Sequence, residues 1–427
     1  MKLKYAVSLI ALSVASTSAL AASQSTGQGS SMAFQNQQLA AMTNDTGVLP
    51  AANWFNHIGV SGLLNLDVFG QTQDKYLATS TVTQGSQSAF NVSTLALNLD
   101  SQINSWVAAH IGLFYATRNQ PAGISGADND GTAATRYYPA NETGGANSNI
   151  NGVDVDDAYV DIMNLSKAPV DFRVGRQYFA YGSYDRYAMM PTLTQQMTEV
   201  RGTGAQLAYM GASGLHAAGF IFRGVNELKS NGQASDTNQI GNGGATIGYT
   251  GVLSKLGFDV SLGYIYAMQD VGAFAQYTTT NYNRRTAGWD GNFALMVGPF
   301  KAGIQYAAAM NSMRDFIWKK DSTDTTGESA EPTAGNIYGS FAFKTAGYNS
   351  KLTASYQWST QGFTAASVGG AERFTVPENR GALEYDVNVL QNTMVGLEIN
   401  RDNAYSKDNN GQGDGSTTGI ARLSILL

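Results

Sequence analysis

The chain has 427 residues, of which 14% are charged, and it carries a formal net charge of −6 and no cysteine. Soluble globular proteins usually carry about a quarter charged residues. The acidic balance argues against a nucleic-acid partner, because that affinity rests on basic side chains that neutralise phosphates. The absence of cysteine excludes a disulfide framework, a thiolate metal site and a cysteine nucleophile.

The N-terminus predicts export. Lys2 and Lys4 precede an apolar run over 6–14, and small residues follow up to Ala22. This pattern predicts a signal peptide over 1–21, cut after Ala21 or Ala22. The alternative is a membrane anchor, but the run is too short to cross about 30 Å of hydrocarbon. Beyond Ala22 no stretch is apolar and long enough to predict a transmembrane helix.

Residues 22–55 are rich in Gly, Ser and Gln and predict a flexible segment with one short helix over 31–42. From 56 to 427 the sequence changes character, and apolar and polar residues alternate in short segments. In the first segment Ile58, Val60 and Leu64 share one face, while Asn65 and Asp67 share the other. A period of two predicts β-strands with one apolar and one polar face.

The alternation predicts about sixteen strands. They are expected at 57–69, 89–100, 106–117, 153–164, 170–179, 199–210, 215–224, 244–252, 257–268, 287–297, 300–310, 335–344, 350–359, 379–390, 394–402 and 418–427. Connections after even-numbered strands are tight, and those after odd-numbered strands are long and polar. A soluble β-sandwich has no reason to keep all its long loops at one end, whereas an outer-membrane barrel does.

The predicted fold is therefore all-β: a transmembrane antiparallel β-barrel with short periplasmic turns and long extracellular loops, in the bacterial outer membrane. The residues that face lipid must be apolar, whereas those that face a water-filled lumen can be polar. Because only one face of each strand can carry charge, the fraction of charged residues in the chain is low. Closure of the barrel removes unpaired strand edges, whose backbone N–H and C=O groups could not form hydrogen bonds with lipid. Aromatic residues near segment ends, such as Trp106, Tyr115, Trp289 and Trp358, fit interfacial girdles.

In the stretch 172–187, Arg173 and Arg176 lie at an odd spacing within a predicted strand. Alternation places Arg173 in the lumen and Arg176 on the lipid-facing side at the end of a strand, where it reaches water or a bulge turns it inward. Tyr178 and the tyrosines at 181, 184 and 187 then lie at the rim or in a folded-in loop. One interpretation is an interface belt with loop packing. The other is a constriction whose arginines contact a carboxylate ligand.

The same alternation provides candidates for the pore lining. They are Asp67, Asp157, Asp161, Arg173, Arg176, Tyr178, Asp259, Lys301, Lys351, Arg380, Glu384 and Arg422. Charges of both signs would create a transverse field that selects polar solutes. Their even mixture leaves the ion selectivity open.

No catalytic or metal site is expected. His57, His110 and His216 share no ligand spacing and have no serine arranged for a triad. We expect no cofactor and no enzymatic activity. The segment 22–55 is too short for a plug domain, so we expect diffusive transport without an energy-coupling partner.

The motif Arg173-Val-Gly-Arg-Gln-Tyr178, with Met190-Pro-Thr-Leu-Thr-Gln195 downstream, resembles the LbtU family of siderophore porins. Residues 156–161 and 199–204 fit the same pattern, and the resemblance is strongest over 153–225. It implies an outer-membrane barrel that takes up a ferric siderophore. The chain departs from the family in its short N-terminal segment and in ending on Leu427 instead of an aromatic residue.

These observations favour an outer-membrane porin that passes small hydrophilic solutes, which by resemblance include a ferric siderophore. A general or nutrient-selective porin is the alternative within transport. The alternative to a transport function is a structural or adhesive barrel whose loops bind extracellular partners. The expected partners are outer-membrane lipids and the solute, with a homotrimer left open.

Overall fold

The computed structural model describes residues 58–73, 85–115, 153–182, 189–224, 227–228, 240–271, 274, 281–282, 284–318, 328–361, 376–406 and 415–427. The predicted signal peptide, the segment 22–55, and Tyr184 and Tyr187 lie outside these residues and stay predictions.

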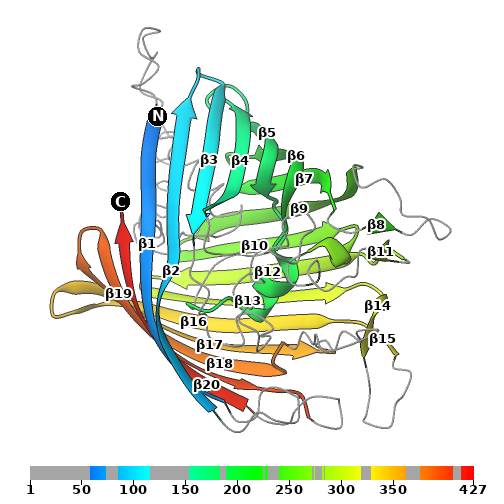
Figure 1. The fold of residues 1–427 in the computed structure, drawn as a ribbon. Coiled ribbons are helices and arrows are strands. Elements are labelled where there is room, and N and C mark those ends of the chain that lie inside the picture. Colours follow the sequence, from blue (N-terminus) through cyan, green and yellow to red (C-terminus); the bar gives the residue numbers. More distant parts are fainter. Residues whose placement is uncertain are drawn as a thin grey trace.

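Sixteen antiparallel strands form one closed barrel (Figure 1). They are β1 (Ile58–Gln73), β2 (Gly85–Gln102), β3 (Val107–Tyr115), β4 (Asp154–Met163), β5 (Val170–Tyr178), β6 (Arg201–Met210), β7 (Leu215–Arg223), β9 (Ile240–Leu253), β10 (Leu256–Ile265), β12 (Gly288–Val297), β13 (Phe300–Ala309), β16 (Thr333–Thr345), β17 (Tyr348–Thr360), β18 (Asn379–Leu390), β19 (Thr393–Asn403) and β20 (Gly415–Leu426). This confirms the predicted fold class and strand count.

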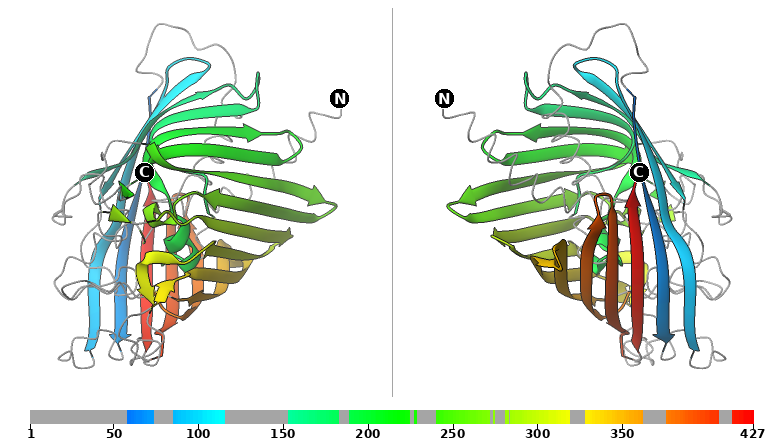
Figure 2. Two further views of the ribbon diagram at one scale, coloured as in Figure 1. Left: turned by 90° about the vertical axis from the view of Figure 1, so that its right-hand side faces the viewer. Right: turned by 90° about the vertical axis from the view of Figure 1, so that its left-hand side faces the viewer.

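The ring closes where β1 pairs with β20, from Leu63 opposite Leu426 to Gln73 opposite Ser416. Figure 2 shows these two strands side by side. Closure leaves no strand edge unpaired in the wall, as a hydrocarbon environment requires.

Short turns gather at one end of the barrel and long connections at the other (Figure 1). Between β16 and β17 the turn is Ala346–Gly347, and both residues have positive φ (50° and 89°). A two-residue turn with this geometry matches the right-handed twist of the paired strands. The predicted alternation of tight and long connections is confirmed.

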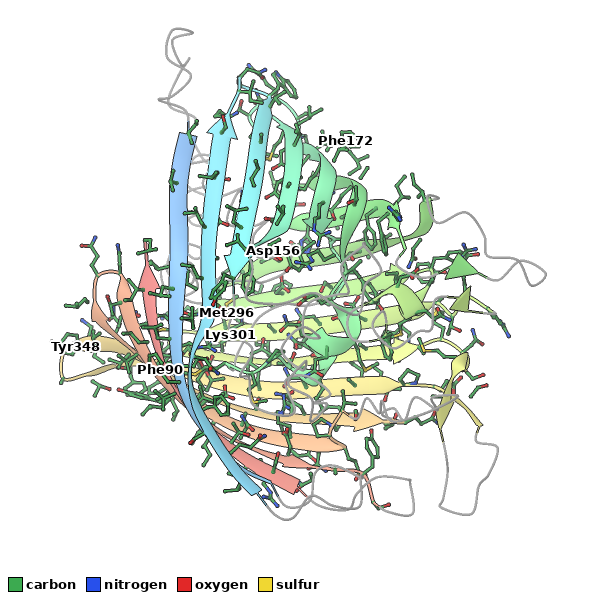
Figure 3. The ribbon with its side chains drawn as sticks, viewed as in Figure 1. Phe90, Asp156, Phe172, Met296, Lys301 and Tyr348 are labelled. Atoms are coloured by element: carbon green, nitrogen blue, oxygen red, sulfur yellow. The ribbon has the colours of Figure 1, made fainter. Side chains whose placement is uncertain are left out.

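The two faces of the wall differ as the alternation predicts. On β5 the side chains of Val170, Phe172 and Val174 are 38–44% exposed, while Asp171 and Arg173 are 1–2% exposed. Figure 3 shows Phe172 pointing away from the barrel. The outer face is apolar and the inner face is polar, which is the arrangement of a barrel in an outer membrane. Among the described residues, no helix is long and apolar enough to cross a membrane.

Aromatic side chains collect near both ends of the outer face. At the short-turn end Phe300 stacks on Phe341, with ring centroids 4.6 Å apart, and Tyr348 lies at the turn (Figure 3). Towards the long connections Trp289 contacts Tyr306 at 5.3 Å. The Trp and Tyr rings among them are amphipathic and suit the two membrane–water interfaces.

The long connections carry structure that the sequence pattern did not predict. Two short strands, β8 (Glu227–Leu228) and β11 (Asn281–Tyr282), pair in parallel. A second pair joins β14 (Met313–Trp318) to β15 (Glu328–Ala330). One α-helix, α3 (Leu193–Thr198), lies between β5 and β6, and a 3₁₀ turn, η3 (Met268–Asp270), follows β10.

Candidate functional site: the barrel lumen and its inward segment

The connection between β5 and β6 folds into the barrel. We call its described residues, 179–182 and 189–200, the inward segment. Phe179 N–H donates to the Val200 carbonyl at 2.9 Å, which joins the two stems. Between them α3 is buried along its whole length and contacts β13, β16 and β17. In the ring of strands, β17 and β18 lie half-way round from β5 and β6. The inward segment therefore crosses the lumen to the opposite wall.

The local sequence explains why α3 begins where it does. Pro191 comes just before the helix, and the Thr192 side chain accepts a hydrogen bond from Gln195 N–H at 3.1 Å. Threonine followed three residues later by glutamine is the pattern of a capping box. At the other end Glu199 N–H donates to the Gln195 carbonyl at 2.9 Å. These contacts satisfy backbone groups that the lumen would otherwise have to solvate.

A row of polar side chains on the opposite wall receives the segment. Strand register places its four members side by side on β13, β16, β17 and β18: Gln305, Asn336, Gln357 and Arg380. Leu193 N–H donates to Gln357 Oε1 at 2.9 Å, and Thr194 Oγ1 donates to Gln305 Oε1 at 3.1 Å. We call these four side chains the docking row.

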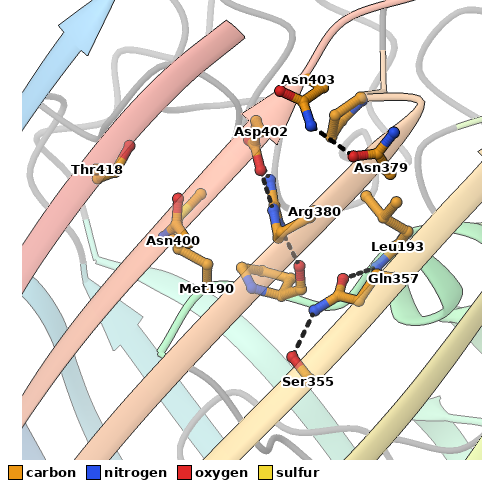
Figure 4. A network of polar contacts seen from close by, with 12 residues as sticks. Met190, Leu193, Ser355, Gln357, Asn379, Arg380, Asn400, Asp402, Asn403 and Thr418 are labelled. Carbon is orange, nitrogen blue, oxygen red and sulfur yellow. Dashed lines mark hydrogen bonds and ion pairs between the residues drawn. The ribbon is translucent and has the colours of Figure 1, made fainter.

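Arg380 is the strongest member of the docking row. Its Nε and Nη2 donate to Asp402 at 2.6 and 2.8 Å, and its Nη1 donates to the Pro191 carbonyl at 2.9 Å (Figure 4). Arg380 and Asp402 are each only 1% exposed. A bidentate, charge-assisted pair fixes the guanidinium plane, so the remaining N–H group points at the inward segment.

Glu398 on β19 anchors the segment further along. Its carboxylate accepts from the backbone N–H groups of both Met189 and Met190, and from the Asn400 amide at 2.9 Å. The same two methionines pack with Phe69 and Ile420 of β1 and β20. This end of the segment therefore combines one polar anchor with one apolar contact.

Nearer its stems the segment contacts the wall on β6, β9 and β12, and the β9 contact is a hydrogen bond from the Thr246 hydroxyl to the Ala180 carbonyl. Gly182 N–H donates to Asp290 Oδ1 at 3.1 Å, and Ala180 N–H donates to Gln206 Oε1 at 2.9 Å. Gly182 has φ of +85°, and a Cβ there would collide with the Thr198 side chain. Only glycine fits this close approach of the two stems.

An apolar core fills part of the lumen. It contains Phe179, Tyr181, Leu193, Met197 and Val200 of the inward segment, together with Phe220, Phe222, Ile265, Met268, Val271, Phe274, Ala307, Ala309, Met313, Ala330, Ala334 and Val376. Phe179 stacks on Phe220 and Phe222 with ring centroids 5.3 and 5.1 Å apart. Each large side chain buried this way contributes about 1.5–3 kcal/mol. We call this group the lumen core.

The wall of β3–β5 carries a second polar cluster. Arg173 Nε donates to Asp161 Oδ1 at 2.6 Å, and its guanidinium lies 4.2 Å from the centre of the Tyr159 ring. Tyr159 in turn stacks on His110 at 4.8 Å, and His110 Nε2 is 3.1 Å from Asp157. Three of the predicted residues, Asp157, Asp161 and Arg173, are thus brought together on the lumen side.

Two predicted residues lie elsewhere. Arg176 and Tyr178 have the same parity on β5 as the exposed Phe172 and Val174, but Arg176 is half-buried and Tyr178 is buried. Arg176 Nε donates to the Asp156 carbonyl at 3.2 Å, and Tyr178 O–H donates to Asp156 Oδ1 at 3.0 Å. Asp156 also pairs with Arg201.

Asp156 is the extra residue of a β-bulge, because Gly112 pairs with Asp157 and Leu113 with Val155. A bulge re-aims a side chain without changing the rest of the strand. The bulge lies in β4 and not in β5, and it gives Arg176 the Asp156 carbonyl and gives Tyr178 and Arg201 the Asp156 carboxylate.

The other predicted residues face the lumen from separate strands. Arg422 makes a bidentate pair with Asp67 at 2.8 and 2.7 Å, and Lys351 pairs with Asp386 at 3.0 Å. Asp259 accepts from Thr250 and Asn292, Lys301 lies 6.0 Å from the Tyr338 ring centre, and Glu384 lies beside Asp386.

Sequence reasoning missed the residues that hold the inward segment. Gln305, Gln357, Asp290 and Glu398 bond to the segment directly, and Asn336 and Asp402 support Gln305 and Arg380. All six lie on lumen-facing positions, so their alternation was visible, but nothing local distinguishes an anchor from a solvated side chain. Within the described ranges, no group of three or more His, Asp or Glu side chains could hold a metal ion.

Comparison with known proteins supports the architecture. No protein-family model matches the chain. It is 25% identical over 259 residues to a UPF0422 protein of Coxiella burnetii, covering 59% of this chain and 51% of that one. A UPF0422 protein of Legionella pneumophila is 20% identical over 265 residues, covering 58% and 46%. The chain thus spans about half the length of these relatives.

Two solved structures share the fold. OprB of Pseudomonas putida aligns with a TM-score of 0.54 and 9% identity, covering 87% of this chain and 95% of that one. An anion-selective porin from Comamonas acidovorans aligns with a TM-score of 0.51 and 10% identity, covering 87% and 99%. The chain is a porin-like barrel of the bacterial outer membrane, since its closed wall carries an apolar outer belt and a polar lumen. The resemblance to the LbtU family is not confirmed.

Proposed function

We propose that this barrel is a passive pore for small hydrophilic solutes. The observation that carries the proposal is the inward segment, which crosses a polar lumen and is fixed to the wall half-way round the ring by buried contacts to Gln357 and Arg380. In such a pore, a segment held this way would narrow the passage, and its position would set the size of solute that passes. The pore needs no catalytic residue and no energy input.

The test is conductance and solute passage by the purified protein. In planar bilayers we expect stable ion-conducting steps, and in liposomes we expect swelling with small sugars that stops above a size limit. A protein that inserts as a folded barrel but leaves the bilayer silent would favour the structural or adhesive alternative. The sugar series separates a general pore from one that admits a narrow class of solute.

The siderophore substrate is a prediction from the family resemblance alone. Its test is the uptake of a labelled ferric siderophore by a deletion strain and by the same strain complemented with the gene. Unchanged uptake in the deletion strain would remove this substrate and leave the general pore in place. The homotrimer is likewise a prediction, to be tested by the mass of the detergent-solubilised protein.

A further inference from the structure

The outer face of the wall carries few charges, and they gather at one end of the barrel. Among the described barrel strands, the charged residues at outward positions are Asp156, Arg176, Arg201, Arg223 and Arg401. Each lies near the end of its strand that joins a long connection. A charge that faces the middle of the bilayer is costly, so these residues mark the membrane–water interface on the outer side of the membrane.

Two of these arginines flank one threonine. Register places Arg176 of β5 opposite Thr203 of β6. On the other side of β6, Gly204 pairs with Phe222 of β7, so the next position along the two strands brings Arg223 opposite Thr203. Neighbouring strands are about 4.8 Å apart, and the long side chains of the two arginines can therefore meet over the threonine. We call Arg176, Thr203 and Arg223 the basic row.

The basic row stays positive after the nearby carboxylate is counted. Asp156 is the acidic member of the outward set, and it forms an ion pair with Arg201. Arg176 Nε donates to the backbone carbonyl of Asp156 at 3.2 Å. The threonine of the row is exposed and its two arginines are half-buried. Because a guanidinium keeps its charge at any physiological pH, the row presents positive charge on the surface of the barrel.

An exposed apolar surface lies next to the basic row, further into the wall on the same three strands. Register aligns Val174 with Ala205 and Ile221, and the following outward set is Phe172, Leu207 and Gly219. The four large side chains of this surface are 40–56% exposed. A Cβ added at Gly219 would meet nothing within 4 Å, so the surface is open there. A positive row beside an open apolar surface matches a lipid with an anionic head and acyl chains.

We infer that the basic row binds the phosphate group of a lipid in the outer leaflet, whose acyl chains lie on the apolar surface beside it. Arginine suits phosphate because its planar guanidinium donates two parallel hydrogen bonds to the phosphate oxygens. The Thr203 hydroxyl supplies another donor between the two arginines. The apolar surface favours a lipid over a soluble phosphate. This inference goes beyond the proposed function and does not depend on it, because the site faces the membrane and not the lumen.

The test is lipid binding by the full-length protein, refolded in detergent and titrated with dipalmitoyl phosphatidic acid, with the bound lipid counted by native mass spectrometry. Dipalmitoylglycerol is the matched lipid, because it has the same acyl chains and no phosphate. We expect phosphatidic acid to bind at least about tenfold more tightly. Equal affinities overturn the inference. Inorganic phosphate that displaces the lipid at an equal concentration also overturns it, because the site would then not need the acyl chains.

Arg176→Gln and Arg223→Gln test the basic row itself. Each variant removes one guanidinium, so we expect each to weaken the binding of phosphatidic acid by about fivefold, and the double variant to weaken it further. Native affinity in the double variant overturns the inference. Mobility that changes on heating in gels shows whether each variant has folded, and the comparison of the two lipids on the native protein needs no variant.

Arg401→Gln is the matched control. Arg401 also points outward near a long connection, but its cross-strand neighbours are Gly381 and Thr417, so no second arginine flanks it. We expect this variant to keep its affinity for phosphatidic acid within about twofold of the native value. If Arg401→Gln and Arg223→Gln weaken binding equally, the lipid is attracted by the charge of the whole rim, and the basic row is not its site.

Discussion

The inward segment is held by two kinds of contact that differ in chemistry. On one side the docking row of β13–β18 binds it through hydrogen bonds and one buried arginine. On the other side the lumen core packs Phe179 of the segment against Phe220 and Phe222 of β7. Apolar burial supplies free energy without direction, whereas hydrogen bonds fix the position at a smaller net gain. The comparison indicates that the lumen core keeps the segment inside and that the docking row sets where it lies.

Removing Arg380 should have the largest effect. Arg380→Ala leaves the buried Asp402 carboxylate without its ion pair and the Pro191 carbonyl without its donor. Breaking a buried pair by deleting one partner costs about 3–5 kcal/mol. We expect the free energy of unfolding in urea to fall by that amount, and the single-channel current to rise and become noisier as the segment loses its position.

Arg401→Ala on β19 is the control for that experiment, because Arg401 is exposed on the outer face and donates to Thr417 Oγ1 at 3.0 Å. Substitutions at such sites usually change stability by less than about 0.5 kcal/mol. If Arg380→Ala and Arg401→Ala lower the free energy of unfolding by the same amount, the docking row does not position the segment.

Removing an aromatic ring from the lumen core should have the next largest effect. Phe179 is fully buried against two other phenylalanines, so Phe179→Ala leaves a cavity that costs about 3 kcal/mol in the free energy of unfolding. If the core retains the segment without directing it, the mean current should change less than in Arg380→Ala. Phe172→Ala is the matched control on the outer face and should cost less, since its ring is 40% exposed.

The wall of this barrel was predictable from the sequence because its signals are local. The alternation in β5, which shows Phe172 and Val174 outward and Asp171 and Arg173 inward, needs only a period of two. The two-residue turns between paired strands are likewise visible in adjacent residues, as Ala346 and Gly347 show. Each of these features depends on a few neighbouring positions in the chain.

The inward segment was not predictable in the same way. Leu193 and its partner Gln357 are 164 positions apart, and Thr194 and Gln305 are 111 apart. A glutamine on the lumen face has the same alternation whether it binds water or a folded-in segment. The capping pattern Thr192 to Gln195 was a local sign of a helix in this connection. It does not say where the helix docks, and the choice of loop depends on partners from many strands of the wall.

The smallest effect should come from one neutral hydroxyl of the inward segment that faces the docking row. Thr194→Val preserves the shape of the side chain but removes the donor to Gln305 Oε1, which keeps its bond from the Asn336 amide at 3.1 Å, and it also removes the 3.0 Å contact between the Thr194 and Thr192 hydroxyls. We expect a loss of about 1 kcal/mol in the free energy of unfolding and a small change in current. Thr353→Val makes the same substitution at a buried lumen position whose hydroxyl has no partner within the described residues. Because no bond is lost there, that variant should be neutral or slightly more stable. If both variants lose the same stability, the hydrogen bond of Thr194 does not hold the segment, and the positioning role falls to the other contacts of the segment, Arg380 and Gln357 among them.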